Sequence, residues 1–148
     1  MDPISNTPQP VDIKPTTPQK TKFKFPTEIV DLPSKGLIYP KENPLSSGKI
    51  EMKYMTAREE DIITNTGYIQ KGIVIDKLLE ALVVSPDVDC TELIVGDKNA
   101  LLVASRILGY GSVYKFSYIG EDYEVDLATL ENKKFDQSLF TKGENKFN

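Results

Sequence analysis

The stretch DLPSKGLIYP (residues 31–40) decides how this chain folds, because it links two segments with the alternating pattern of β-strands. Proline lacks the backbone donor that helices and central strands need, so we expect this stretch to be a loop. Gly36 suits the positive φ of the turn before the apolar run Leu37, Ile38 and Tyr39. Two interpretations of this run stay open: a lid over the domain's own core, or an anchor that enters a partner protein.

Strand patterns flank this loop on both sides. Before it, Phe23 and Phe25 alternate with lysines and share one face of an expected edge strand, which Pro26 ends. After it, a Ser-Ser-Gly turn at residues 46–48 precedes a second strand over residues 50–54. We therefore expect a hairpin or meander with a long intervening loop.

A capping box marks the first expected helix. In TAREEDIITN, Glu59 follows Thr56 by three residues, so that each side chain can satisfy the other's backbone N–H. The acidic residues of the first turn also interact favourably with the positive end of the helix dipole. Asn65 and Gly67 are expected to end this short helix.

Two longer helices are expected to follow. The first carries an apolar stripe at helical spacing, formed by Ile75, Leu78, Leu79, Leu82 and Val83. The second has Asp97 as its expected N-cap and Gly109 as the residue after its end. Gly109 and Gly111 follow this helix, whereas phosphate loops place glycines before a helix, so no nucleotide loop is expected.

The strongest hairpin pattern is SVYKFSYIGEDYEVDL (residues 112–127). Tyr114, Phe116 and Tyr118 alternate with polar residues, and IGED supplies the turn. Exposed edge strands with such aromatic side chains are templates for strand addition by a partner. The pattern therefore predicts a contact surface on this hairpin.

Composition narrows the function. The 148 residues include no histidine and one cysteine, Cys90, which excludes catalytic triads with histidine, an internal disulfide and multi-cysteine zinc sites. The net charge of −4 gives no general attraction to nucleic acid or anionic membrane. The sequence contains no apolar run of membrane-spanning length and no signal-peptide pattern. We expect no catalytic activity, no cofactor and no metal.

These patterns predict an α+β fold: short N-terminal strands, a central bundle of about three helices and a β-hairpin, preceded by a disordered arm. The proline-rich arm covers residues 1–22. The domain covers residues 23–127, with strands in 23–55, helices in 56–109 and the hairpin in 113–127. Residues 128–148 form a polar tail, which is expected to pair with a partner or to continue into a longer natural chain.

Three motifs, in this order, resemble the T4-type bacteriophage baseplate hub family: LPSKG-x-x-YP, MTAREEDI and GDKNA-x-x-x-x-x-R-x-x-GYG. The resemblance covers about residues 23–118. It implies a structural or assembly protein of the contractile-tail hub, located in the virion and, during assembly, in the host cytoplasm. Members of that family often carry a Cys-x-x-Cys pair in the hairpin region and run longer at the C-terminus. This hairpin has no cysteine, so it is expected to be free of metal.

Two functions follow from the resemblance. The first is a hub subunit in an oligomeric assembly that contacts other hub proteins or the tape-measure protein. The second is a transient tail-assembly chaperone that leaves before the virion matures. An enzyme using Glu59, Asp61 or Asp87 is a third hypothesis, which lacks a convergent pocket in the sequence. The residues expected to contact a partner are the aromatic and apolar ones singled out above: Phe23, Phe25, Leu37, Ile38, Tyr39, Tyr114, Phe116 and Tyr118.

Overall fold

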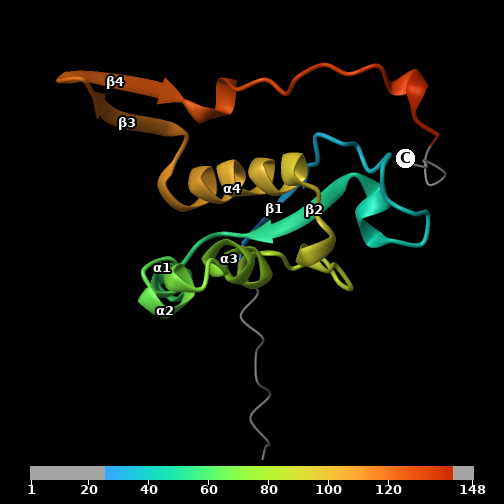
Figure 1. Ribbon diagram of the computed structural model, residues 1–148, viewed down its shortest axis with the longest axis horizontal. Coiled ribbons are helices and arrows are strands. Elements are labelled where there is room, and N and C mark those ends of the chain that lie inside the picture. Colours follow the sequence, from blue (N-terminus) through green and yellow to red (C-terminus); the bar gives the residue numbers. More distant parts are fainter. Residues whose placement is uncertain (1–25, 142–148) are drawn as a thin grey trace, which may run out of the picture.

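The computed structural model describes residues 26–141, and within them the expected α+β fold is confirmed (Figure 1). This region contains four α-helices and two antiparallel sheets of two strands each. In chain order the elements are β1 (Thr27–Asp31), β2 (Lys49–Lys53), α1 (Ala57–Ile63), α2 (Thr66–Gln70), α3 (Val74–Leu82), α4 (Val95–Tyr110), β3 (Val113–Tyr118) and β4 (Glu121–Asp126). None of these helices is long and apolar enough to cross a membrane.

The first sheet supports one side of the core. β1 and β2 pair in register from Thr27 opposite Lys53 to Asp31 opposite Lys49. On β2, Ile50 and Met52 are fully buried and alternate with more exposed residues, as expected for a strand with one face on the core. The strand predicted around residues 23–25 lies outside the described residues, and the first observed strand starts only after Pro26.

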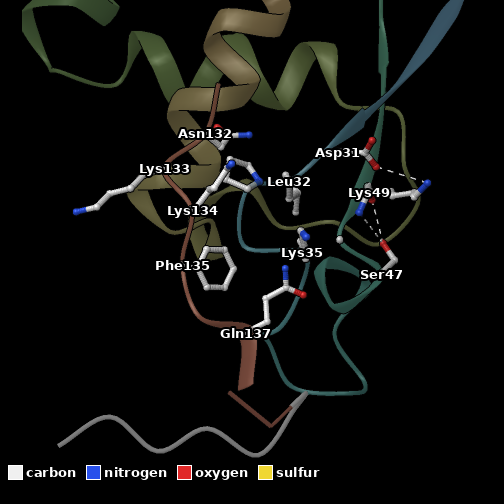
Figure 2. Close-up of a pocket in the computed structure, with 12 residues that line it drawn as sticks. Asp31, Leu32, Lys35, Ser47, Lys49, Asn132, Lys133, Lys134, Phe135 and Gln137 are labelled. Atoms are coloured by element: carbon white, nitrogen blue, oxygen red, sulfur yellow. Dashed lines mark hydrogen bonds and ion pairs between the residues drawn. The ribbon is translucent and has the colours of Figure 1, made fainter. Parts of the chain in front are cut away.

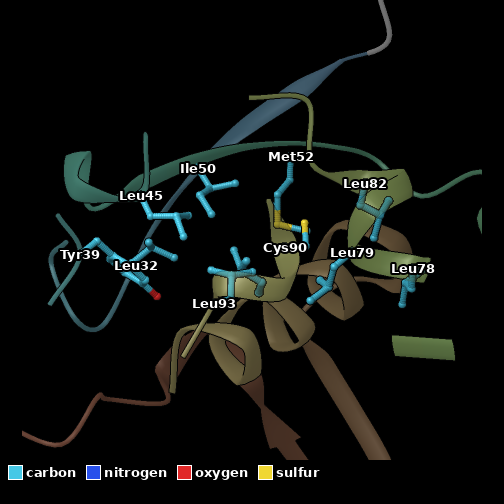
Figure 3. Close-up of a cluster of buried hydrophobic side chains, with 11 residues drawn as sticks. Leu32, Tyr39, Leu45, Ile50, Met52, Leu78, Leu79, Leu82, Cys90 and Leu93 are labelled. Carbon is cyan, nitrogen blue, oxygen red and sulfur yellow. The ribbon is translucent and has the colours of Figure 1, made fainter. Parts of the chain in front are cut away.

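The core joins this sheet to α3, α4 and the loop after β1 (Figure 3). From α3 it takes Leu78, Leu79 and Leu82, three members of the predicted apolar stripe. Side chains from the loops complete it. Its buried apolar members are Leu32, Tyr39, Leu45, Ile50, Met52, Leu78, Leu79, Leu82, Cys90, Leu93 and Leu101.

The loop between β1 and β2 is compact rather than open. Gly36 has φ of +72°, and a Cβ added there would lie 2.3 Å from the carbonyl oxygen of Ser46. Gly48 has φ of +71° and faces the backbone of Lys35, while the N–H of Leu32 donates to the Gly48 carbonyl (2.8 Å). Only glycine combines this backbone conformation with such close approach. The two ends of the loop are therefore held against each other.

α1 ends at Ile63, just before the predicted stop at Asn65, but Gly67, the other predicted stop, lies inside a further helix. Asn65 caps this helix, α2, because its side chain accepts from the N–H of Tyr68 (3.0 Å). Both predicted ends of α4 are wrong. α4 starts at Val95, two residues before the predicted N-cap Asp97, and runs to Tyr110, past Gly109. Gly111, with φ of +82°, is the residue that follows this helix.

Beyond the core, the second sheet projects from the end of α4 as a hairpin (Figure 1). After β4 the chain runs back along α4, on the side that faces away from α3 in Figure 1. This segment contains short 3₁₀ turns at Leu127–Thr129 and Gln137–Leu139. This returning segment lies beside the loop after β1, where the two line a common groove. The hairpin itself contributes no residue to the buried core cluster.

Candidate interaction surface

One side of the hairpin carries a row of exposed aromatic rings. The register places Tyr114 opposite Val125 and Phe116 opposite Tyr123, so that these four side chains share one face with Tyr118. The Phe116 ring stacks on Tyr114 (5.7 Å between centroids) and on Tyr123 (5.5 Å). We call these five residues the aromatic face. Their neighbours on the hairpin leave large parts of the rings in solvent, from 39% of Phe116 to 61% of Tyr118.

The opposite side of the hairpin carries three carboxylates, one lysine and one serine, with Val113 as its apolar residue. Lys115 forms an ion pair with Glu124 (3.0 Å), and the Ser117 hydroxyl donates to Asp122 (2.5 Å). Asp126 lies on the same side and accepts from the N–H of Ala128 (3.0 Å). β4 thus presents three carboxylates on one face, and on the other face Tyr123 and Val125 together with Glu121, which lies next to the turn and accepts from the Tyr123 hydroxyl (2.9 Å).

Contacts at its base hold the hairpin to α4. The Arg106 guanidinium lies over the rings of Tyr110 (4.8 Å) and Tyr114 (5.6 Å) and donates to the Gly111 carbonyl (3.1 Å). The N–H of Leu127 donates to the carbonyl of Ser112 (2.8 Å), which closes the base of the hairpin. An isolated two-stranded hairpin is only marginally stable in water, so these contacts help to keep the hairpin folded.

The turn of the hairpin is tighter than the predicted IGED turn, because Glu121 and Asp122 already belong to β4. Ile119 and Gly120 both have positive φ, 52° and 79°. Two consecutive positive values match the twist of the flanking strands. Ile119 is 83% exposed at this tip. The tip therefore adds an apolar side chain to a surface that is already aromatic.

The apolar run of the loop after β1 is divided between core and surface. Tyr39 is only 4% exposed and belongs to the core, whereas Leu37 and Ile38 are half-buried. The ring of Tyr39 is therefore covered by the domain itself, and a partner could contact it only after local unfolding. Of the two interpretations of this run, the lid over the domain's own core describes Tyr39.

A buried polar cluster holds Tyr39 in place. Asp97, fully buried in the first turn of α4, accepts from the Tyr39 hydroxyl (2.7 Å) and from the hydroxyl (2.6 Å) and N–H (3.0 Å) of Ser34. The Tyr39 oxygen in turn accepts from the N–H of Ile94 (3.1 Å). We call Ser34, Tyr39 and Asp97 the Asp97 cluster. Burial of the hydroxyl, together with the neighbouring Asp97 carboxyl, raises the pKa of Tyr39 well above its usual range.

Glu59 is a second buried acid with all its interactions directed inward. Its carboxylate accepts from Lys53 Nζ (2.7 Å) and from the N–H (3.0 Å) and hydroxyl of Thr56, which confirms the carboxylate half of the predicted capping box. Burial alone would raise the pKa of Glu59, but the bonds from Lys53 and Thr56 outweigh it and hold this pKa below its usual range. A carboxylate held in this way acts in the fold and is a poor general base.

A groove separates the loop after β1 from the returning C-terminal segment (Figure 2). Its volume is about 720 Å³, and Lys35, Lys49, Lys133 and Lys134 are among its lining residues. Lys49 pairs with Asp31 (3.5 Å), and Figure 2 shows Lys133 extending away from the groove. In the part of the chain that the structure describes, no buried side-chain polar atom lacks a hydrogen bond. The groove therefore offers no built ligand site, and we assign it none.

The structure brings only part of the predicted contact set together. Tyr114, Phe116 and Tyr118 lie on one exposed face, as the alternation of the sequence predicted. Phe23 and Phe25 lie outside the described residues. Sequence reasoning missed Tyr123, although the alternation of β4 marks it, because only the register shows that it stacks on Phe116.

Comparison with known proteins identifies no relative of this chain. Across residues 26–141 no group of three or more Cys, Asp or Glu side chains is placed to hold a metal ion. No protein-family model, curated protein or solved structure matches the chain.

Proposed function

We propose that this protein is a structural or assembly subunit of a bacteriophage tail baseplate hub, which works through protein–protein contacts. The observation that carries the proposal is the aromatic face of the β3–β4 hairpin. Its rings lie outside the core, and the described domain closes its core without them. Contiguous exposed aromatic surface of this kind is typical of interaction sites.

The energetics of interfaces favour this use of the hairpin. Aromatic side chains dominate binding energy, and truncation of one commonly costs about 2 kcal/mol or more. Phe116 and Tyr123 already stack on each other, so a partner can bury both rings at little further cost in side-chain entropy. The free outer edges of β3 and β4 also offer backbone groups for an added strand.

The assignment to a phage tail rests on the sequence motifs. LPSKG-x-x-YP forms the loop that carries Ser34 and Tyr39, and GDKNA begins in the first turn of α4 with Asp97. Two motifs of the resemblance thus meet in the Asp97 cluster, 58 residues apart between Tyr39 and Asp97. This long-range contact gives the two motifs a common role in the fold of this chain.

Co-purification from infected cells tests the proposal. The tagged full-length chain should retain hub or tape-measure proteins, and Phe116→Ser with Tyr123→Ser should release them. Lys77→Ser with Glu80→Ser is a matched control, because it removes an exposed ion pair on α3, away from the hairpin. A chain that retains no tail protein, or a hairpin variant that retains as much as the control, would contradict the proposal.

Mass spectrometry of purified virions then separates the two roles. Presence in a fixed ratio to known baseplate subunits supports a hub component. Absence from virions, with retention of tape-measure protein in cell extracts, supports the alternative role as a transient assembly chaperone.

A further inference from the structure

We propose that the hairpin of one copy binds the Lys22–Phe25 segment of a second copy, as a strand added to the outer edge of β4. This inference rests on the proposed role of the hairpin as an interaction surface and names its partner. The argument begins with the free edge. Within residues 26–141, β4 pairs only with β3, so its other edge has no strand neighbour.

The two faces of β4 define what an added strand must carry. Tyr123 and Val125 point to the aromatic face, where Glu121 lies only at the turn end and accepts from the Tyr123 hydroxyl, whereas Asp122, Glu124 and Asp126 point to the other face. β3 supplies a single cation to that second face, Lys115, which pairs with Glu124. A complementary strand therefore needs apolar side chains on one face and cations on the other, with a period of two residues.

The segment TKFKF at residues 21–25 has this pattern. Phe23 and Phe25 alternate with Lys22 and Lys24. When the phenylalanines lie beside the aromatic face, the period of two places both lysines beside the carboxylates of β4. A shift of one residue would place the phenylalanines beside the carboxylates and the lysines beside the aromatic face. The charge contacts and the aromatic contacts therefore favour the same register. β3 carries no such row of acids, which favours β4 as the edge.

The position of β1 makes a second copy the source of the segment. Pro26 directly precedes β1, and its carbonyl accepts from the N–H of Tyr54 (3.2 Å). β1 begins on the side of α4 that is opposite to the hairpin (Figure 1). Residues 22–25 are tethered there and extend by at most about 3.5 Å each, whereas the same segment of another copy has no such constraint.

Self-association of the purified full-length chain tests this inference without any other tail protein. Sedimentation velocity over a wide range of concentrations should show reversible association that weakens as salt is added. An arm variant, Lys22→Glu with Lys24→Glu, should raise the dissociation constant about tenfold or more. Lys14→Glu with Lys20→Glu is its control, because it changes the net charge equally at lysines outside the segment.

A charge exchange between copies makes the test specific. The hairpin variant Lys115→Glu, Asp122→Lys and Glu124→Lys keeps an opposite-charge pair across the two strands. It reverses two of the three charges on the acidic face of β4 and leaves Asp126, which caps the following turn, unchanged. Alone, the arm variant and the hairpin variant should each associate weakly. Mixed together they should associate, because each acidic arm then meets a basic hairpin and each basic arm an acidic one.

Three results would overturn the inference: a wild-type chain that stays monomeric, an arm variant that associates like the Lys14/Lys20 control, or a mixture that stays as weak as its components. Circular dichroism verifies that each variant is folded, and Phe23→Ser with Phe25→Ser is a second arm variant that leaves charge unchanged. A monomeric wild type that still retains tail proteins from infected cells would refute self-association but leave the proposed function standing.

Discussion

Removal of one oxygen atom from Tyr39 tests whether the Asp97 cluster holds the loop after β1 on α4. Tyr39→Phe keeps the buried ring and therefore the core packing. It deletes the hydroxyl that donates to Asp97 (2.7 Å) and accepts from the N–H of Ile94 (3.1 Å). Both partners lie at the start of α4, so the substitution removes the two hydrogen bonds of Tyr39 to this region, while the bonds from Ser34 to Asp97 remain.

The expected loss follows from the two bonds. A hydrogen bond to a carboxyl group that can be charged contributes about 1.5–3 kcal/mol, and a neutral one to a backbone N–H about 0.5–1.5 kcal/mol. Tyr39→Phe should therefore lower the free energy of unfolding by about 2–4.5 kcal/mol at neutral pH. Tyr54→Phe is the matched control: its ring is 36% exposed, and the loss should stay within about 0.5 kcal/mol.

The pH dependence gives this prediction a distinct signature. The pKa of Tyr39 is raised by burial and by Asp97, so the folded state keeps the proton at a pH where the unfolded chain, with its pKa near 10, has lost it. The contribution of Tyr39 is complete below about pH 10 and decreases above it by about 1.4 kcal/mol per pH unit. Tyr39→Phe lacks this titration, so the difference between the two proteins should shrink as the pH rises above 10.

Urea unfolding at several pH values, followed by far-ultraviolet circular dichroism, measures both effects. A loss below about 0.5 kcal/mol at neutral pH would show that the hydrogen bonds of the Tyr39 hydroxyl do not stabilise the fold. A difference that stays constant above pH 10 would show that the Tyr39 hydroxyl titrates normally. Either result would refute the reasoning from burial and hydrogen bonding.

Three further substitutions or probes test other contacts of the domain. Gly36→Ala should destabilise the fold by more than about 1 kcal/mol in urea unfolding, because Gly36 has positive φ and a Cβ there would lie 2.3 Å from the Ser46 carbonyl oxygen; a stability equal to that of wild type would contradict the close approach. Lys53→Met should cost about 1–3 kcal/mol by leaving the buried Glu59 without its ion pair. Because the pKa of Glu59 is lowered in the folded state, the ion pair stabilises the fold above the usual pKa range of glutamate. In wild type this stabilisation should disappear as the pH falls through the acidic range. A difference in stability between wild type and Lys53→Met that persists at low pH would contradict this expectation. Cys90 is buried and burial raises its pKa, so a thiol reagent should modify it much more slowly in the folded protein than in urea, and equal rates would contradict its burial.

Local patterns predicted those parts of the fold that depend on neighbouring residues. The carboxylate of Glu59 meets Thr56 three residues away, and the β3–β4 turn uses two adjacent residues with positive φ. Asp97 shows the limit of such patterns. An aspartate before an apolar helical stretch has the local properties of an N-cap, but its actual partners Ser34 and Tyr39 lie 63 and 58 residues away. Only the packing of the loop against α4 decides between the two roles.

Local sequence patterns also predicted part of the candidate surface. The period of two placed Tyr114, Phe116 and Tyr118 on one face, whatever the strand packs against. The same kind of pattern could not separate these residues from Tyr39, because an apolar run looks alike whether it is buried or exposed. Burial depends on where the segment docks, which a local pattern does not contain.

The contrast between Tyr39 and Phe116 leads to a last prediction about binding. Tyr39 has both its ring and its hydroxyl satisfied within the domain, so a partner could use it only after local unfolding. The Phe116 ring stacks on two hairpin residues, Tyr114 and Tyr123, and Phe116 remains 39% exposed. Phe116→Ser should therefore reduce retention of the partner strongly while changing the free energy of unfolding by about 1 kcal/mol or less. Tyr39→Phe should reduce retention only under conditions in which it also unfolds the protein. If the two variants lose binding in the same proportion to stability, the aromatic face has no role in recognition beyond that of the fold.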